Sequence, residues 1–406
     1  MKKQYSLLSL PVIVAALGFF VDVFDLLLFG IVRKPSLKDL GLSDADIFSK
    51  GELILSVQMI GLVAGGILWG ILGDKKGRLK VLFGSILLYA IANIANGFVH
   101  TVPQYIVIRF IAGVGLAGEL GAGITLTSEL LPKEKRGLAS TVITVTGVFG
   151  SVAAVLLHNY FKDWRLLYFI GGGMGLVLLL LRVSVAESNM FNEVKDTSLQ
   201  RGNFLMFFNN RDRFVRYIKG ILIGIPVWYV IGLLINFSDK FAEHMGVKNI
   251  DPGQAIMFQY CGLALGDLSA GLVSNVLKSR KKALYIFYAI TTIFIAIYFT
   301  QHNVSSAHFY WVCGGLGYGA GISVLYITTS AEQFGTNLRA TAAISITNMV
   351  RGTLPLILLL FRTLNGTAGN YLTAGWITGA VLMLIAVAAA YFTRESFGKE
   401  LDFTES

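Results

Sequence analysis

Charged residues are scarce in this chain of 406 residues, because Asp, Glu, Lys and Arg together account for only 14% of it. A soluble globular domain carries about a quarter charged residues, so this scarcity excludes an ordinary soluble fold. The two cysteines, Cys261 and Cys313, stand in apolar runs without CxxC or Cys/His spacing, which predicts buried free thiols and no metal site. The chain contains no GxxxxGK[ST] motif, which excludes ATP binding by a P-loop.

Apolar residues, in contrast, make up 54% of the chain, and glycine is abundant with 45 residues. Roughly twelve apolar runs reach the length of about 18–25 residues that a membrane-spanning helix needs. They lie near residues 10–31, 52–72, 79–99, 104–128, 138–158, 165–183, 214–236, 253–277, 284–301, 307–329, 340–361 and 370–392. The first run is too long for the apolar part of a signal peptide, so we interpret it as the first span. The sequence therefore predicts an all-α membrane protein with twelve transmembrane helices.

The formal net charge of +10 is concentrated in the loops of one side of the predicted membrane protein. If both termini are cytoplasmic, most lysines and arginines, among them Lys75 and Lys76, fall in cytoplasmic loops, as the positive-inside rule requires. No basic tail or aromatic–basic array indicates nucleic acid. We therefore expect a multi-pass protein of a bacterial-type cytoplasmic membrane, acting as a monomer without nucleic acid.

The two halves of the chain repeat. When the sequence is aligned with itself, Glu129 matches Glu332 and Arg136 matches Arg339. The basic residues 75–78 match residues 278–281 in the same alignment. Six spans followed by six in the same orientation form the parallel repeat of secondary transporters. The predicted organisation is a six-helix bundle over 1–185, a polar cytoplasmic linker over 186–213 and a second six-helix bundle over 214–406.

Residues 73–80, GDKKGRLK, resemble the G-D-x-x-G-R-x-[KR] loop motif of the major facilitator superfamily. Further segments are similar to its metabolite:proton symporter branch, which includes citrate, 2-oxoglutarate, shikimate and betaine carriers. These segments are residues 22–30, 109–119, 163–165, 187–191 and 332–339. The resemblance implies the major facilitator fold, with two pseudo-symmetric bundles, alternating access, no enzymatic activity and no cofactor, the proton gradient being the energy source.

The resemblance also implies a cytoplasmic gate. Asp74 is expected to accept hydrogen bonds from a helix N-terminus and Arg78 to pair with a carboxylate of a neighbouring span, which would stabilise the outward-open state. The alternative is that these charges only anchor a loop. The predicted gating residues are Gly73, Asp74, Gly77, Arg78, Glu129, Arg136, Glu332 and Arg339.

Ionisable residues inside apolar spans are costly and usually functional. Asp22 and Asp25 lie three residues apart on one helix face, where two carboxylates in a low dielectric favour uptake of a proton. We predict that Asp22, Asp25 and Glu119 include the proton-coupling group. Arg109 is permanently charged and needs an anionic partner, either an aspartate or a substrate carboxylate. The alternative is a buried ion-pair network without a role in turnover.

Arg351 lies about midway along the eleventh run, with Asn348 one turn before it. A permanent cation at that depth predicts an anionic substrate, although pairing with Asp267 is the alternative. In citrate-type carriers of the resembling branch, arginines of the fourth and eleventh spans hold carboxylates, which implies the same role for Arg109 and Arg351. Other side chains expected to line the substrate site are Gln58, Trp228, Tyr229, Asn236, Tyr318, Tyr326 and Asn348.

Together these features predict proton-coupled import of a small organic anion, resembling a di- or tricarboxylate, with protons and the lipid bilayer as further partners. The alternatives within transport are export of a carboxylate-bearing metabolite or siderophore, and transport of a zwitterion such as a betaine. A transporter-like receptor or a membrane-embedded enzyme belongs to another class, and no nucleophile–base pair or metal-ligand constellation indicates catalysis.

Overall fold

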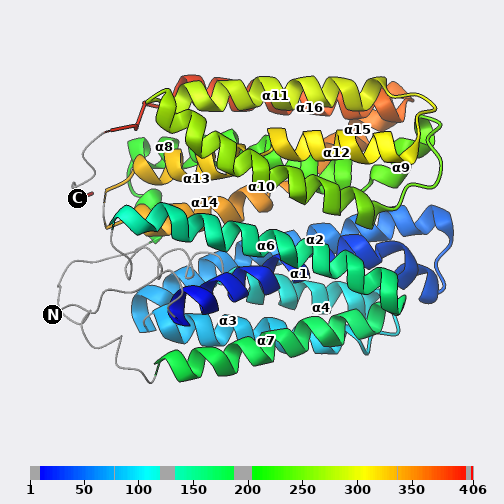
Figure 1. Ribbon diagram of the computed structural model, residues 1–406, viewed down its shortest axis with the longest axis horizontal. Coiled ribbons are helices and arrows are strands. Elements are labelled where there is room, and N and C mark those ends of the chain that lie inside the picture. Colours follow the sequence, from blue (N-terminus) through cyan, green and yellow to red (C-terminus); the bar gives the residue numbers. More distant parts are fainter. Residues whose placement is uncertain are drawn as a thin grey trace. The chain divides into compact units, whose positions relative to one another are not determined.

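The computed structural model describes residues 10–76, 78–118, 133–186, 204–335, 337–398, 404 and 405, and the regular structure within these ranges is entirely helical. The described helices before residue 187 are α1 (Leu10–Asp39), α2 (Asp44–Lys76), α3 (Arg78–Asn96), α4 (Val102–Leu116), α6 (Lys133–Phe161) and α7 (Trp164–Ala186) (Figure 1). They are followed by η2 (Phe204–Phe207), α8 (Arg211–Trp228), the π-helix η3 (Tyr229–Ile235), α9 (Ser238–His244), α10 (Pro252–Val276), α11 (Arg280–Thr300), α12 (Ser306–Gly319), α13 (Ile322–Glu332), α14 (Arg339–Arg351), α15 (Leu354–Ala368) and α16 (Tyr371–Tyr391).

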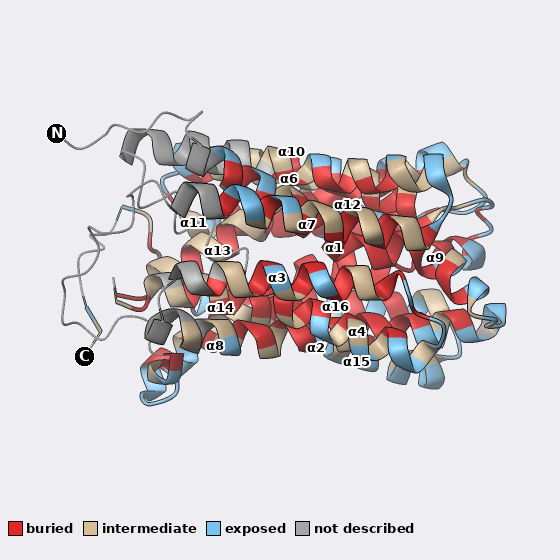
Figure 2. Ribbon diagram, turned by 90° about the horizontal axis from the view of Figure 1, so that it is seen from below, coloured by how far each residue is buried: buried red, intermediate tan, exposed pale blue. Residues whose placement is uncertain are grey.

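The helices have the length and surface of membrane spans. Among the described residues, eight helical stretches are long and apolar enough to cross a bilayer, and shorter apolar helices cover residues 83–96, 102–116 and 145–161. Large apolar side chains lie exposed on helix faces, among them Leu180 at 69%, Trp311 at 71% and Leu384 at 70%. Exposed faces alternate with buried ones along the helices, as Figure 2 shows. Lipid solvates such apolar surface, whereas water would not.

The chain divides into two compact units, Met1–Phe204 and Leu205–Ser406. In the first unit, α1 packs against α6 and α7, and α3 packs against α4 and α7. In the second unit, α8 packs against α13, α14 and α16, and α12 packs against α10 and α11. Residues 187–203 of the predicted linker lie outside the described residues, and residues 211–213 already belong to α8, so the extent of the linker remains a prediction.

Glycines bring α2 and α4 of the first unit into backbone contact. A Cβ added to Gly61 would lie 2.3 Å from the carbonyl oxygen of Phe110, and a Cβ on Gly65 would lie 2.3 Å from that of Val114. Real Cβ atoms do not approach an oxygen so closely, so only glycine permits this packing.

The same contact recurs between α10 and α12 of the second unit. A Cβ on Gly262 would lie 1.9 Å from the carbonyl oxygen of Gly314, and a Cβ on Gly266 would lie 2.2 Å from that of Tyr318. The two glycines are four residues apart in both helices, one turn of an α-helix. The internal repeat therefore includes the packing of the helices as well as the loops.

In the described part of the chain, two of the predicted spans are discontinuous. α12 ends at Gly319 and α13 begins at Ile322, while α14 ends at Arg351 and α15 begins at Leu354. Pro355 lies in the first turn of α15, where its missing N–H leaves no internal hydrogen bond unmade. The second break therefore has a local cause in the sequence.

Two expectations need correction. The loop that the motif at residues 73–80 implies is shorter than the motif, because α2 continues through Lys76 and α3 begins at Arg78, on either side of residue 77, which is not among the described residues. Lysine is a good helix former, which explains why α2 continues. Cys313 is a buried free thiol as predicted, but Cys261 is exposed. An apolar residue of a membrane helix is stable facing lipid, so an apolar run alone does not predict burial in the protein.

The glycine contact predicts a position-specific effect within α10. Gly262→Ala places a methyl group against a backbone carbonyl, so overpacking should lower stability by about 1–3 kcal/mol. Gly271→Ala on the same helix is the control, since no atom lies within 4 Å of its added Cβ, and it should leave stability unchanged or raise it. Thermal unfolding in detergent measures both, and equal effects would contradict the packing described.

Candidate functional site

Asp25 of α1 and Arg109 of α4 form an ion pair inside the first unit. Nη1 of Arg109 lies 3.7 Å from Oδ1 of Asp25, and neither side chain has exposed surface. This separation is an electrostatic contact rather than a direct hydrogen bond. Removing two charges from water is costly, so each side chain stays charged inside the unit only because the opposite charge of its partner compensates that cost. The arginine has the aspartate partner that was one of its two predicted alternatives.

Polar and aromatic groups surround the guanidinium of Arg109. Nη1 donates to Oδ1 of Asn93 at 3.3 Å, and Nη2 donates to the backbone carbonyl of Asp25 at 3.5 Å. The ring of Tyr168 lies 5.3 Å from the guanidinium carbon, within the range of a cation–π contact. The guanidinium is therefore held by groups that carry no charge, apart from Asp25.

A hydroxyl chain continues from Tyr168. Its hydroxyl lies 2.7 Å from that of Tyr105, and the Tyr105 hydroxyl donates to Oγ of Ser36 at 3.5 Å. All three side chains are buried. The first unit thus contains a continuous polar network from the Asp25–Arg109 pair to Ser36 of α1.

Of the other predicted site residues of the first unit, the structure describes Asp22 and Gln58 but not Glu119. Asp22 is fully buried on α1, one turn before Asp25, and Gln58 is fully buried on α2. Glu119 lies outside the described residues. Of the three predicted proton-coupling residues, Asp25 lies against Arg109. The proton-coupling role of all three residues stays a prediction.

In the second unit, Arg351 is the last residue of α14 and is 7% exposed. Its positive charge lies at a helix C-terminus, where the peptide dipoles favour a cation. Asn348 on the same helix and Tyr326 of α13 are each 2% exposed. These three side chains come from the two discontinuous spans. Trp228 is buried at the end of α8, and Tyr318 is half-buried on α12.

Asp267, the alternative partner for Arg351, contacts the start of α13. Oγ of Ser323 donates to Oδ1 of Asp267 at 2.6 Å, and the N–H of Val324 donates to the same oxygen at 3.2 Å. The carboxylate from α10 therefore accepts from one side-chain hydroxyl and from one backbone N–H of the first turn of α13, where N–H groups have no helical partner.

Tyr229 and Asn236, two of the side chains expected to line the substrate site, make hydrogen bonds within the second unit. The hydroxyl of Tyr229 donates to the carbonyl of Gly375 at 2.7 Å, and Nδ2 of Asn236 donates to the carbonyl of Ile231 at 2.8 Å. These bonds fix both side chains within the second unit and give them a structural role.

Among the predicted gating residues, Glu332 at the end of α13 makes the clearest contacts. Its two carboxylate oxygens accept from Arg280, at 3.0 Å and 3.3 Å, and one also accepts from Oγ of Ser396 at 2.6 Å. Arg339 is the first residue of α14. Glu332 thereby ties α13 to the start of α11 and to the segment after α16.

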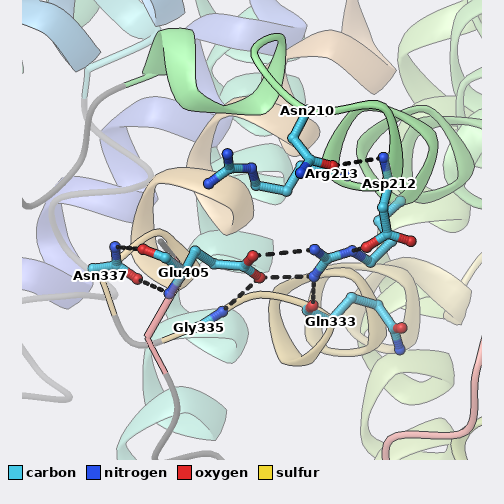
Figure 3. Close-up of polar contacts among 8 residues, drawn as sticks. Asn210, Asp212, Arg213, Gln333, Gly335, Asn337 and Glu405 are labelled. Carbon is cyan, nitrogen blue, oxygen red and sulfur yellow. Dashed lines mark hydrogen bonds and ion pairs between the residues drawn. The ribbon is translucent and has the colours of Figure 1, made fainter.

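A second carboxylate, Glu405, binds the segment between the predicted gating residues Glu332 and Arg339 (Figure 3). The guanidinium of Arg216 on α8 holds it in bidentate fashion, at 2.7 Å and 3.1 Å, and the N–H of Gly335 donates to it at 3.3 Å. The backbone of Glu405 exchanges two 2.9 Å hydrogen bonds with the side chain of Asn337. Arg216 also stacks on Phe334, 5.0 Å from the ring centroid. Residue 405 thus links α8 to the loop between α13 and α14.

The remaining gating residues cannot be assigned contacts. Gly73, Asp74, Arg78 and Arg136 lie on described backbone without described side chains, and Gly77 and Glu129 lie outside the described residues. Their gating role remains a prediction.

Two carboxylates outside the membrane-spanning segments have lowered pKa values. The guanidinium of Arg165 hydrogen-bonds Asp39, which lowers the pKa of that carboxyl. Burial opposes ionisation of Glu395, but the Ser279 hydroxyl and backbone N–H groups at the start of α11 bind its carboxylate and lower its pKa to about 2. Both groups act as fixed anions at neutral pH that connect helix ends.

Sequence reasoning missed several residues of these clusters. Tyr105 lies four residues before Arg109, on the same face of α4, and this spacing was an available signal. Asn93 and Tyr168 come from α3 and α7, and no spacing connects them to Arg109. Among the described residues, no group of three or more His, Cys, Asp and Glu could hold a metal ion.

Apolar spans, two helical units and ionisable residues buried inside a unit define a polytopic membrane transporter. The chain belongs to the major facilitator superfamily, whose family model matches residues 15–359. It is a transporter and not an enzyme. The predicted all-α membrane fold and the predicted family resemblance are thereby confirmed.

Related proteins support this placement. A Haemophilus influenzae protein whose name assigns it to metabolite transport is 28% identical over 358 residues, covering 83% of this chain and 84% of its own. The cis,cis-muconate transport protein of Acinetobacter baylyi is 24% identical over 391 residues, covering 93% and 90%. The fold is similar to that of the proton:xylose symporter XylE, with a TM-score of 0.69, 15% identity and 97% of each chain covered.

The buried ion pair predicts an asymmetric response to mutation. Removing one partner should cost about 3–5 kcal/mol, because the other charge remains buried. Asp25→Leu should cost more than Arg109→Leu, because a carboxyl group can take up a proton whereas a guanidinium stays charged. Thermal unfolding of the single and double variants measures this, and the double variant should recover part of the loss. Small, equal and additive effects would contradict the pairing.

The Arg216 contacts predict different roles for its two carboxylate partners. Glu405→Gln should lower stability by about 1–3 kcal/mol, because the Glu405 side chain is only 12% exposed and links separate segments. Asp212→Asn is the matched control, since Asp212 contacts Arg216 within one helix at 2.8 Å and its side chain is 63% exposed. Its removal should cost about 0.5 kcal/mol or less. Equal shifts in unfolding temperature would show that the link does not stabilise the unit.

Proposed function

We propose that this protein imports a small organic anion across a bacterial-type cytoplasmic membrane, coupled to protons and by alternating access. The observation that carries the proposal is the fully buried Asp25–Arg109 pair, separated by 3.7 Å. A carboxylate and a permanent cation held in a low dielectric form a site whose charge balance changes when a proton binds.

Coupling arises from competition for Arg109. When Asp25 is ionised, it supplies the anion that the guanidinium requires. When Asp25 is protonated, the guanidinium loses that partner and favours a substrate carboxylate in its place. Proton and anion then bind together, and each increases the affinity for the other, which is the thermodynamic requirement of symport.

Arg351 is proposed as the substrate-binding cation of the second unit. It lies at the end of α14, beside the helix break, and is nearly buried. Guanidinium groups bind carboxylates in bidentate fashion, which favours planar organic acids over neutral sugars. Asn348 and Tyr326 add neutral hydrogen-bonding groups for orientation.

The names of the relatives favour the same class of substrate. They include transporters of cis,cis-muconate, gentisate, benzoate and sialic acid, all of which carry carboxylates. We therefore propose a carboxylate-bearing metabolite, of which a di- or tricarboxylate is the narrower form predicted from the sequence. The excess of basic residues in one set of loops supports cytoplasmic termini in this proposal, and the proposed functional form is a monomer.

Counterflow in proteoliposomes tests the proposal with a panel of benzoate, gentisate, cis,cis-muconate, citrate, 2-oxoglutarate, glycine betaine and xylose. We expect exchange of at least one carboxylate and alkalinisation of the outer medium during its net uptake. Arg109→Lys and Arg351→Lys should each reduce the initial rate at least about tenfold, because lysine cannot bind a carboxylate in bidentate fashion.

Arg362→Lys is the matched control, since Arg362 is exposed on α15, the helix that follows Arg351. It should leave the rate unchanged. Transport of betaine or xylose alone, carboxylate uptake without proton movement, or inertness towards the whole panel would contradict the proposal.

A further inference from the structure

One sequence pattern occurs in both units at equivalent positions. Residues 58–65 read QMIGLVAG and residues 259–266 read QYCGLALG, which share the pattern Q-x-x-G-L-x-x-G. The two glycines of each pattern are those that bring α2 against α4 and α10 against α12. A glutamine therefore precedes the glycine contact by the same interval in each repeat.

The backbone shows that the two glutamines are structurally equivalent. A Cβ on Gly113 of α4 would lie 2.3 Å from the carbonyl oxygen of Gln58. A Cβ on Gly317 of α12 would lie 1.9 Å from the carbonyl oxygen of Gln259. Each glutamine backbone thus packs on a glycine of the partner helix.

Helix packing explains the glycines but not the amides. Both glutamine side chains have no exposed surface, and neither Oε1 nor Nε2 of either one hydrogen-bonds to any residue that the structure describes. Leaving a buried polar group without a partner costs about 1–3 kcal/mol. An apolar side chain of similar size would avoid that cost, yet the amide occurs in both repeats.

We infer that Gln58 and Gln259 are substrate-contacting residues, each supplying a carboxamide that hydrogen-bonds to the transported molecule during the cycle. Gln259 is a new assignment, and Gln58 gains a structural reason for the role expected from its sequence. A carboxamide donates through Nε2 and accepts through Oε1 without adding charge. The substrate is then an organic anion with polar groups beyond the carboxylate that the arginines hold, an inference that rests on the proposed function.

Kinetics separate this role from a structural one. Gln58→Leu and Gln259→Leu should each raise the KM for gentisate or cis,cis-muconate at least about tenfold in proteoliposomes. Their unfolding temperatures should stay unchanged or rise, because no described hydrogen bond is lost. A lower unfolding temperature with an unchanged KM would overturn the inference in favour of a structural amide.

Thiol labelling provides a readout that does not require a known substrate. In a chain with Cys261 and Cys313 replaced by alanine, Gln58→Cys and Gln259→Cys should react with a membrane-impermeant maleimide. Ile54→Cys and Ala255→Cys are the controls, since they lie one turn earlier on the same two helices and are equally buried. They should remain unreactive.

The two readouts also separate failure of this inference from failure of the proposed function. If the wild type ignores every carboxylate of the panel, the proposed function fails, and labelling alone decides the inference. Labelling at positions 58 and 259 above that at 54 and 255 supports a transport pathway lined by the amides. Labelling no greater than that of the controls overturns it.

Discussion

The guanidinium of Arg109 lies with no exposed surface among membrane helices, where a charge loses the hydration that stabilises it in water. Arginine does not lose its proton, so the surrounding unit must supply an anion. Asp25 supplies it at 3.7 Å, and Asn93 and Tyr168 contribute an amide oxygen and a ring face. Four helices, α1, α3, α4 and α7, therefore depend on one charge for part of their arrangement.

The backbone packing makes such a polar interior possible. Glycine contacts bring α2 to α4 and α10 to α12 so closely that backbone carbonyls face the neighbouring helix directly. Helices packed in this way leave little room for rearrangement within a pair, because any added side-chain atom would collide with a backbone atom. The second unit adds two discontinuous spans, one stabilised by Asp267 and the other ending in Arg351. A unit that combines rigid helix pairs with interrupted helices suits a carrier whose substrate-binding side chains move together with the helices that hold them.

Much of the fold could be predicted from the sequence, because apolar length is a direct consequence of bilayer thickness. Within the described residues, each predicted span coincides with a helix or with two consecutive helices, apart from the end of the fourth span, of which residues 119–128 lie outside the described part of the chain. The break after Arg351 could not be foreseen from hydropathy, which does not distinguish a continuous helix from two halves. Burial was also misjudged at Cys261, because lipid and protein interior are equally apolar. The partners of Arg109 required tertiary structure, since Asn93 and Tyr168 come from other helices. The Q-x-x-G-L-x-x-G repeat was readable but had no evident meaning until the amides proved to be buried.

The central claim is that Asp25 exchanges a proton while Arg109 exchanges one anion for another. Asp25→Asn tests it most directly, because the amide imitates the protonated carboxyl in shape and charge. Transport of a carboxylate of the panel is measured in proteoliposomes, once as counterflow without a gradient and once as accumulation driven by a pH gradient. The account predicts that the variant retains counterflow and loses accumulation. Accumulation at the wild-type level would contradict it.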